Sequence, residues 1–278
     1  LYYPSMAWLP LPPLLSETLR YFGRFQYPLT SSELWFWQHG TKFPKPHINK
    51  LNAKWQMPNA KLVKLRKQRE IFSQKKWIIA RRVGESLSRI FSVQAIFVTG
   101  SLAMSNCKKH DDIDVMIITT PYTLWLTRLI VVLYLVHHHL RRPPSLPEHA
   151  SPRVSGKICD NLYLDTKNLK LKNKNLYIAH EVLQAKCIFD RGGLHRQFLI
   201  QNAWVGDYLP IAYSESIKKF KNLKTRKSFG FLLAPLNLIA FTIQRLYMWP
   251  KITSEHITLG SAFFHPRRSI RPLKVMAK

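Results

Sequence analysis

Two apolar runs joined by a Gly-Ser turn are the feature that most constrains what this chain can fold into. The first run, residues 96–98, ends at Thr99-Gly100-Ser101, and the second, residues 113–118, carries Asp112 and Asp114 at its start. Apolar runs bounded by turn residues are typical of buried strands. Since side chains alternate between the two faces of a strand, Asp112 and Asp114 should share one face while their apolar neighbours enter the core. The segment therefore predicts two core strands joined by a turn and a short helix.

The paired aspartates predict a metal site. Two carboxylates that lie side by side repel each other unless a positive group lies between them, and a hard divalent cation is the usual solution. A Gly-Ser turn at the start of a helix can hold phosphate oxygens. A metal beside a phosphate-binding turn indicates phosphoryl or nucleotidyl transfer.

This arrangement resembles the signature of the nucleotidyltransferase superfamily typified by DNA polymerase beta. That signature is Gly followed by Gly or Ser, a spacer of about a dozen residues, and then Asp, an apolar residue and a second acid. Thr99-Gly100-Ser101 and Asp112-Ile113-Asp114-Val115 fit it at every position. The resemblance implies that Gly100 permits close approach of a triphosphate and that Ser101 bonds a phosphate oxygen. It also implies that Asp112 and Asp114 hold magnesium, with two ions bound.

The alternative is a Gly-Ser turn in an ordinary α/β domain, followed by an exposed acidic loop. Charge argues against it, because the chain has 43 Lys and Arg residues but only 15 Asp and Glu, for a formal net charge of +28. Asp111, Asp112 and Asp114 lie within four positions, and such a cluster is not expected as surface decoration on so basic a chain. The basic excess favours polyanionic partners: nucleoside triphosphates, RNA or DNA bound through basic helices, or an anionic membrane face.

Residues 1–60 predict a small unit of helices. Residues 15–25 can form a short amphipathic helix, and a second helix should start at Thr30, where Glu33 completes a capping box. Two short helices joined this closely resemble the first half of a winged helix-turn-helix, followed by a loop or wing. A helical hairpin that packs on the core is the alternative. Residues 21–35 also resemble the front of a group of uncharacterised bacterial nucleotidyltransferases.

Residues 61–170 predict the catalytic core. Residues 61–90 indicate one or two helices with a strongly basic face, and Ile71, Ile78 and Val83 are expected to supply apolar contacts. A face this basic could follow a phosphate backbone, although a solvated helix surface is the commoner outcome and is expected for most of these residues.

The superfamily usually needs a third carboxylate from a neighbouring strand, which assists the metal and can take a proton from the attacking hydroxyl. The candidate strand is residues 157–165, where alternation puts Asp160 on one face with Leu162 and Leu164. Asn161 lies on the other face and matches the polar strand position of the similar bacterial proteins. The third acid is therefore displaced to Asp160 or absent. The predicted catalytic set is Asp112, Asp114 and Asp160.

Residues 171–278 predict a helical C-terminal region. Residues 175–186 indicate a helix on which His180 and Glu181 either face a nucleotide or serve in packing. Two apolar stretches, 124–136 and 229–243, raise the possibility of a membrane. The uninterrupted part of the first is shorter than the roughly 20 residues that span a bilayer. For the second, which follows a basic segment, docking on the core is expected, and a peripheral membrane helix is the alternative.

We therefore expect an α+β fold: a polymerase-beta-type core, in which helices pack a mixed sheet, with an N-terminal winged-helix-like segment. An apolar content of 46% argues against global disorder. The three widely spaced cysteines favour buried thiols in a reducing cytoplasm. Leu1 in place of Met suggests that the reading frame is truncated. Asp165, at the end of the candidate strand, is expected in a turn.

The leading functional hypothesis is transfer of a nucleoside monophosphate from an NTP to an acceptor hydroxyl, with Mg²⁺ and release of pyrophosphate. The second is a catalytically weak or silent relative that binds nucleotide or nucleic acid. The third is a protein apposed to a membrane, and membrane association is not the expected outcome.

Overall fold

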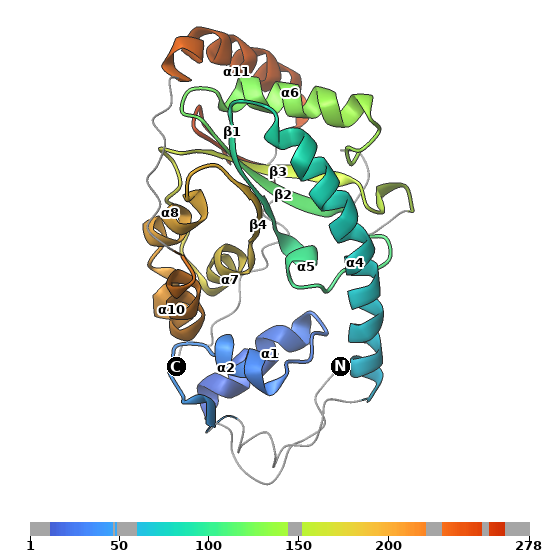
Figure 1. Cartoon of the computed structure of the whole chain (residues 1–278), viewed down its shortest axis with the longest axis vertical. Coiled ribbons are helices and arrows are strands. Elements are labelled where there is room, and N and C mark those ends of the chain that lie inside the picture. The colour runs from blue at the N-terminus through green and yellow to red at the C-terminus, as the bar shows by residue number, and fades with distance from the viewer. Residues whose placement is uncertain are drawn as a thin grey trace.

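The computed structural model describes residues 12–46, 48, 60–143, 152–220, 230–251 and 256–264. These residues fold around a six-stranded sheet with the strand order β4-β1-β2-β3-β6-β5 (Figure 1). Strands β2 and β3 pair in parallel, and the other neighbours pair antiparallel. The strands are β1 (Val93–Val98), β2 (Ile113–Thr119), β3 (Ile158–Asp165), β4 (Lys186–Asp190), β5 (His256–Ile257) and β6 (Ser261–Phe263). A mixed sheet packed by helices confirms the α+β class.

The two apolar runs of the Gly-Ser segment form the neighbouring strands β1 and β2. They are interior strands, and because both of their faces are covered, they read as nearly continuous apolar sequence. Val98 pairs with Val115, and the Thr99 N–H donates to the Asp114 carbonyl oxygen at 3.0 Å. This pairing places the short helix α5 (Gly100–Ala103) against the start of β2.

Helices cover both faces of the sheet. One face packs against α4 (Ala60–Ser88), α6 (Leu124–His137) and α11 (Ala234–Met248). The other face packs against α7 (Leu176–Gln184) and α8 (Leu194–Gln201). The buried cluster on this face continues into α9 (Val205–Tyr208), α10 (Pro210–Lys218), α1 (Pro13–Arg24) and α2 (Ser31–Phe36). Figure 1 shows α6 and α11 side by side at one end of the molecule and α1 and α2 at the opposite end.

The N-terminal helices share the main core. Tyr21 and Phe22 of α1 and Trp37 after α2 belong to the same buried cluster as Phe97 of β1. Packing therefore crosses the predicted domain boundary at residue 60. Residues 37–46 and 48, the described part of the predicted wing region, contain no strand, and residues 47 and 49–59 lie outside the described residues. The packing is that of a helical hairpin on the core.

The predicted capping box at the start of α2 is confirmed. The Glu33 N–H donates to the Thr30 hydroxyl oxygen, and the Thr30 N–H donates to the Glu33 carboxylate. The same carboxylate accepts two hydrogen bonds from Arg66 of α4, each of 2.7 Å. A local helix signal therefore also fixes the hairpin to the long helix.

Helix α4 is a single helix, but its apolar contacts differ from the prediction. Ile71 and Ile78 are 54% and 63% exposed. Being seven residues apart they share one helix face, and this face is turned to solvent. The expectation that these two residues contact the core is wrong, whereas it is confirmed for Val83, which is buried. The buried stripe is formed by Arg69, Ser73, Lys76, Ala80, Val83, Gly84 and Leu87.

Two of the predicted basic surface residues on α4 are buried. Arg69 donates to the Phe25 carbonyl oxygen and to the Asn106 side chain, at 2.8 and 2.9 Å. Lys76 donates to the Lys108 carbonyl oxygen at 2.6 Å. Burial lowers the pKa of both side chains. These cations hold the loop that leads from α5 to the paired aspartates.

The sequence predicts a helical C-terminal region, but this region also contributes strands to the sheet. Strands β4, β5 and β6 come from residues after 170, and β4 pairs with β1. Strand β4 follows α7 almost directly, and its first residue, Lys186, lies in the predicted helix 175–186. The main sheet thus crosses the predicted boundary at residue 170.

Candidate metal and nucleotide site

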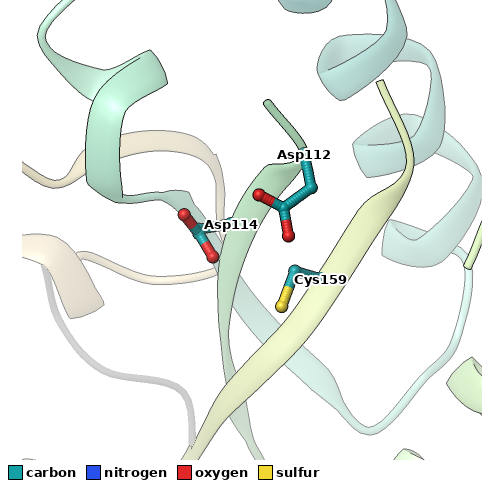
Figure 2. A group of neighbouring side chains, drawn as sticks. All are labelled: Asp112, Asp114 and Cys159. Carbon is teal, nitrogen blue, oxygen red and sulfur yellow. The ribbon is translucent and has the colours of Figure 1, made fainter. Parts of the chain in front are cut away.

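The structure brings the paired aspartates together at the start of β2. Asp112 immediately precedes β2 and is 4% exposed, whereas Asp114 lies within the strand. A carboxylate oxygen of Asp112, a carboxylate oxygen of Asp114 and the Sγ atom of Cys159 on β3 all lie within 4.8 Å of one another. Figure 2 shows Asp112 and Cys159 between β2 and β3, with Asp114 on the other side of the β2 ribbon in this view. The predicted proximity of the two carboxylates is confirmed.

Gly100 is adjacent to this cluster and has no room for a side chain. Its φ of +62° lies in the left-handed region, and a Cβ atom there would lie 2.5 Å from Asp114 Oδ2. Only glycine permits both the conformation and the approach. The position that the sequence assigned to phosphate contact therefore also lets the backbone reach a carboxylate.

Ser101 is held toward the loop that precedes β2. Its hydroxyl donates to Asp111 Oδ2 at 3.2 Å, and the same oxygen accepts the Lys108 N–H at 2.8 Å. Asp111 therefore organises the turn and is not one of the converging carboxylates. Contact of Ser101 with a phosphate stays a prediction.

The chain supplies its own counter-charges to the two aspartates. Arg142 Nε lies 3.2 Å from Asp112 Oδ2, and the Asn161 amide donates to Asp114 Oδ1 at 2.6 Å. The repulsion between the carboxylates is thus reduced by a guanidinium and an amide as well as by any cation. Sequence reasoning missed Arg142, whose only signal was its position in a pair of arginines after the apolar helix α6.

Asp160 is not brought to the other two carboxylates. Its carboxylate forms an ion pair with Arg141 at 2.7 Å and accepts a hydrogen bond from the Tyr163 hydroxyl at 3.2 Å. Tyr163 packs in the cluster beneath α6, on the opposite side of the sheet from the site. Asp160 therefore serves a buried structural pair, and Asn161 is the residue of β3 that contacts Asp114.

The predicted grouping of Asp160 with Leu162 and Leu164 is wrong because β3 does not alternate strictly. Asp114 is opposite Cys159, but Met116 is opposite Leu162, so β3 has one extra residue between these pairs. A bulge of this kind leaves two residues opposite one and reverses the alternation beyond it. The turn predicted at Asp165 is confirmed, because its carboxylate accepts the Lys167 N–H at 2.8 Å.

Cys159 is the ligand candidate that sequence reasoning missed. It faces Asp114 across the β2–β3 pair, a position that only the parallel register reveals. Burial, followed by the neighbouring carboxylates, raises the pKa of its thiol well above the usual value. The group is therefore a neutral thiol. A neutral thiol is a poor ligand for Mg²⁺, which prefers oxygen donors.

Glu181 of α7 contacts the Gly-Ser turn. Its carboxylate accepts hydrogen bonds from the Gly100 backbone N–H and from Tyr177, while burial raises its pKa to about 7. Sequence reasoning left open whether Glu181 faces a nucleotide. In the structure it contacts the Gly-Ser turn, which is predicted to bind phosphate.

His180 has a packing role. It is fully buried, stacks on Tyr21 with ring centroids 4.1 Å apart, and lies 3.0 Å from His39 through their Nε2 atoms.

The donor set fits one hard divalent cation better than it fits two. Two carboxylates converge, and the close approach of Gly100 leaves no side chain between the turn and Asp114. Oxygen ligands of this kind suit Mg²⁺. Since Asp160 is committed to Arg141, the described residues offer no third carboxylate in this cluster.

We expect Gly100→Ala to lower the free energy of unfolding more than Gly40→Ala does. Gly40 has a similar φ of +57°, but its added Cβ would lie 3.9 Å from the nearest side-chain atom. Both variants carry left-handed strain of about 1–2 kcal/mol, and only Gly100→Ala adds a clash with Asp114. Urea unfolding measures both variants. Equal losses of stability would show that the Asp114 contact imposes no constraint.

We also expect Glu181 to make stability depend on pH. A carboxyl whose pKa is 4.5 when unfolded and about 7 when folded holds its proton more tightly in the folded state. Its contribution to stability is therefore lost as the pH rises from 4.5 to 7.

Glu181→Gln should consequently gain stability relative to wild type at pH 8 compared with pH 5, as measured by thermal unfolding. Glu85→Gln, on the exposed surface of α4, is the control and should show no such difference. Parallel pH profiles for wild type and Glu181→Gln would contradict the assignment.

Comparison with known proteins adds no relative to this picture: no family model, curated protein or solved structure matches the chain. The resemblance to polymerase-beta-type nucleotidyltransferases therefore depends on the Gly-Ser turn and the paired aspartates.

Proposed function

We propose that the chain binds a nucleoside triphosphate with Mg²⁺ and transfers its nucleoside monophosphate to an acceptor hydroxyl, releasing pyrophosphate. The observation that carries this proposal is the contact between the Gly-Ser turn and the paired carboxylates. Gly100 approaches Asp114 where no other residue fits, and Asp112 lies beside it. A phosphate-binding turn and an oxygen-donor cluster are thereby joined in one site, which supports a polymerase-beta-type core.

Each group in the chain then has a separate task. Asp112 and Asp114 would hold Mg²⁺, which neutralises phosphate charge when bound. Arg142, beside Asp112, adds a fixed positive charge at the same edge. The Gly100 N–H donates a hydrogen bond to Glu181, and a phosphate oxygen can accept this hydrogen bond once Glu181 is displaced.

The acceptor is proposed to be a polyanion such as RNA or DNA. After the buried Arg69 and Lys76 are set aside, α4 still carries an exposed row of cations. They are Lys61, Lys64, Lys67, Lys75, Arg81 and Arg82. Such a row can contact successive phosphates.

A second candidate is nucleotide binding without turnover, and the geometry of Asn161 favours it. An amide occupies the position next to Asp114 where a third acid is expected, and an amide cannot take a proton from an acceptor hydroxyl. Arg142 also shares Asp112 with any metal. Both features are compatible with binding, and both would weaken catalysis.

The first experiment incubates the protein with radiolabelled ATP or CTP, Mg²⁺ and mixed RNA and DNA acceptors. We expect label transfer by wild type and a loss of about a hundredfold or more in Asp112→Asn/Asp114→Asn, since metal ligation supplies several kcal/mol of stabilisation. Asp207→Asn/Glu85→Gln, at exposed positions on α9 and α4, is the charge-matched control and should retain transfer.

Thermal shift with Mg²⁺ and ATP separates binding from turnover, because a ligand stabilises the state that binds it. Stabilisation without label transfer would favour the silent relative. If wild type shows neither, the nucleotide site itself is refuted.

The second experiment restores the missing acid with Asn161→Asp. Without metal, a third carboxylate beside Asp114 should destabilise the protein through like-charge repulsion, and Mg²⁺ should reverse this loss. Where the amide limits turnover, label transfer should rise by about tenfold or more, in line with general-base contributions. Asn173→Asp, at an exposed position, is the control. Unchanged transfer together with unchanged Mg²⁺ dependence would exclude Asn161 from the site.

A further inference from the structure

Helix α11 buries two polar side chains against the protein and turns most of its large apolar side chains toward solvent. The residues that it buries are Asn237, Ala240 and Gln244, while Phe241 and Met248 are partly buried against the same core. Asn237 Oδ1 accepts the backbone N–H groups of Trp125 and Leu126 at the start of α6, and Gln244 contacts the Trp125 carbonyl oxygen and Arg128. A helix in water normally shows the reverse pattern, with its apolar stripe toward the core.

The outward side of α11 is a large apolar surface. Its members are Leu236, Leu238, Ile239, Ile243, Leu246, Tyr247 and Trp249, which are between 53% and 70% exposed. On the neighbouring helix α6, Leu133 and Val136 are also more than half exposed. We call the exposed apolar residues of these two helices the outer face. Figure 1 shows α11 as the outermost layer at this end of the molecule.

The side chains that α11 buries are small or polar, and most of its large apolar side chains lie outside. This arrangement is found in a lipid environment. Among the described residues, Gly230–Met248 is long and apolar enough by composition to cross a membrane. However, α11 is packed lengthwise on α6, and its polar contacts with Trp125 and Arg128 hold it there. A helix fixed in this way is suited to lie along an interface, with its outer side among the acyl chains.

The positive charge of the sequence around α11 favours an anionic lipid surface. Between Glu215 and Glu255 the sequence contains no acid, and its bases are Lys218, Lys219, Lys221, Lys224, Arg226, Lys227, Arg245 and Lys251. Arg245 is exposed on α11 itself, where it lies over the Phe241 ring. Tyr247 and Trp249, at the C-terminal end, are residue types that favour the level of lipid headgroups.

We propose that the outer face docks on an anionic membrane surface, with α11 lying in the plane of the interface. The apolar side chains enter the acyl region, and the exposed Arg245 contacts lipid phosphates. The expected docking of this helix on the core is confirmed by its packing on α6. Membrane association was the alternative for this stretch, and the sequence could not show which side of α11 faces the protein. This inference is independent of the metal site.

The experiment is flotation of the full chain with vesicles of phosphatidylcholine alone and with vesicles that also contain phosphatidylserine. We expect wild type to float with the anionic vesicles, and added salt to weaken binding. Ile239→Gln/Ile243→Gln/Leu246→Gln removes three outward side chains and should weaken binding by about tenfold or more. Because the three sites are exposed and glutamine is a good helix former, circular dichroism should show an intact fold. The single variant Leu246→Gln provides an intermediate loss.

Ile71→Gln/Ile78→Gln is the matched control, since these two isoleucines are equally exposed but lie on α4. It should bind as wild type does. Absence of wild-type binding, equal binding to neutral vesicles, or unchanged binding of the triple variant would overturn the proposal. A wild-type dimer that the triple variant converts to monomers, without vesicle binding, would also overturn it and would assign the outer face to a second copy of the chain.

Discussion

The antiparallel pairing of β1 with β2 is the interaction on which the rest of the site depends. It connects the Thr99 N–H to the Asp114 carbonyl oxygen and thereby sets the Gly-Ser turn against the paired aspartates. Gly100 tolerates this closeness because it has no Cβ and adopts a positive φ. Lys76 and Asp111 then hold the intervening loop from outside the strands. A hydrogen-bond register thus brings together groups that lie more than ten residues apart.

Charge is organised by pairing across the sheet rather than by net excess alone. The consecutive residues Arg141 and Arg142 serve opposite faces: Arg141 binds Asp160, and Arg142 binds Asp112. Arg141 forms a bridge with Ile158 beside the sheet, so the backbone there is extended and successive side chains point in opposite directions. Some of the basic excess is therefore structural, whereas the row of cations on α4 is exposed.

Parts of this structure were predictable because their causes are local. The capping box at Thr30 and Glu33, the turn at Asp165 and the apolar strands β1 and β2 each follow from the conformation and burial of a few neighbouring residues. Predictions that depended on contacts with a second helix or strand were wrong. Ile71 and Ile78 face solvent because α4 packs through the stripe that contains Arg69 and Lys76. Strand β4 is defined by its pairing with β1, which no property of its five residues announces.

By itself the sequence determined that Gly100, Ser101, Asp112 and Asp114 belong to one turn-and-strand unit, because spacing and alternation act over short distances. Tertiary structure decided which groups complete that unit. The bulge in β3 and the ion pair with Arg141 turn Asp160 away and direct Asn161 to Asp114, while parallel pairing adds Cys159. It also decided that α11 turns its polar side inward, because only the contact with α6 gives Asn237 and Gln244 their partners. These outcomes depend on register and on contacts between distant segments, which a linear pattern does not encode.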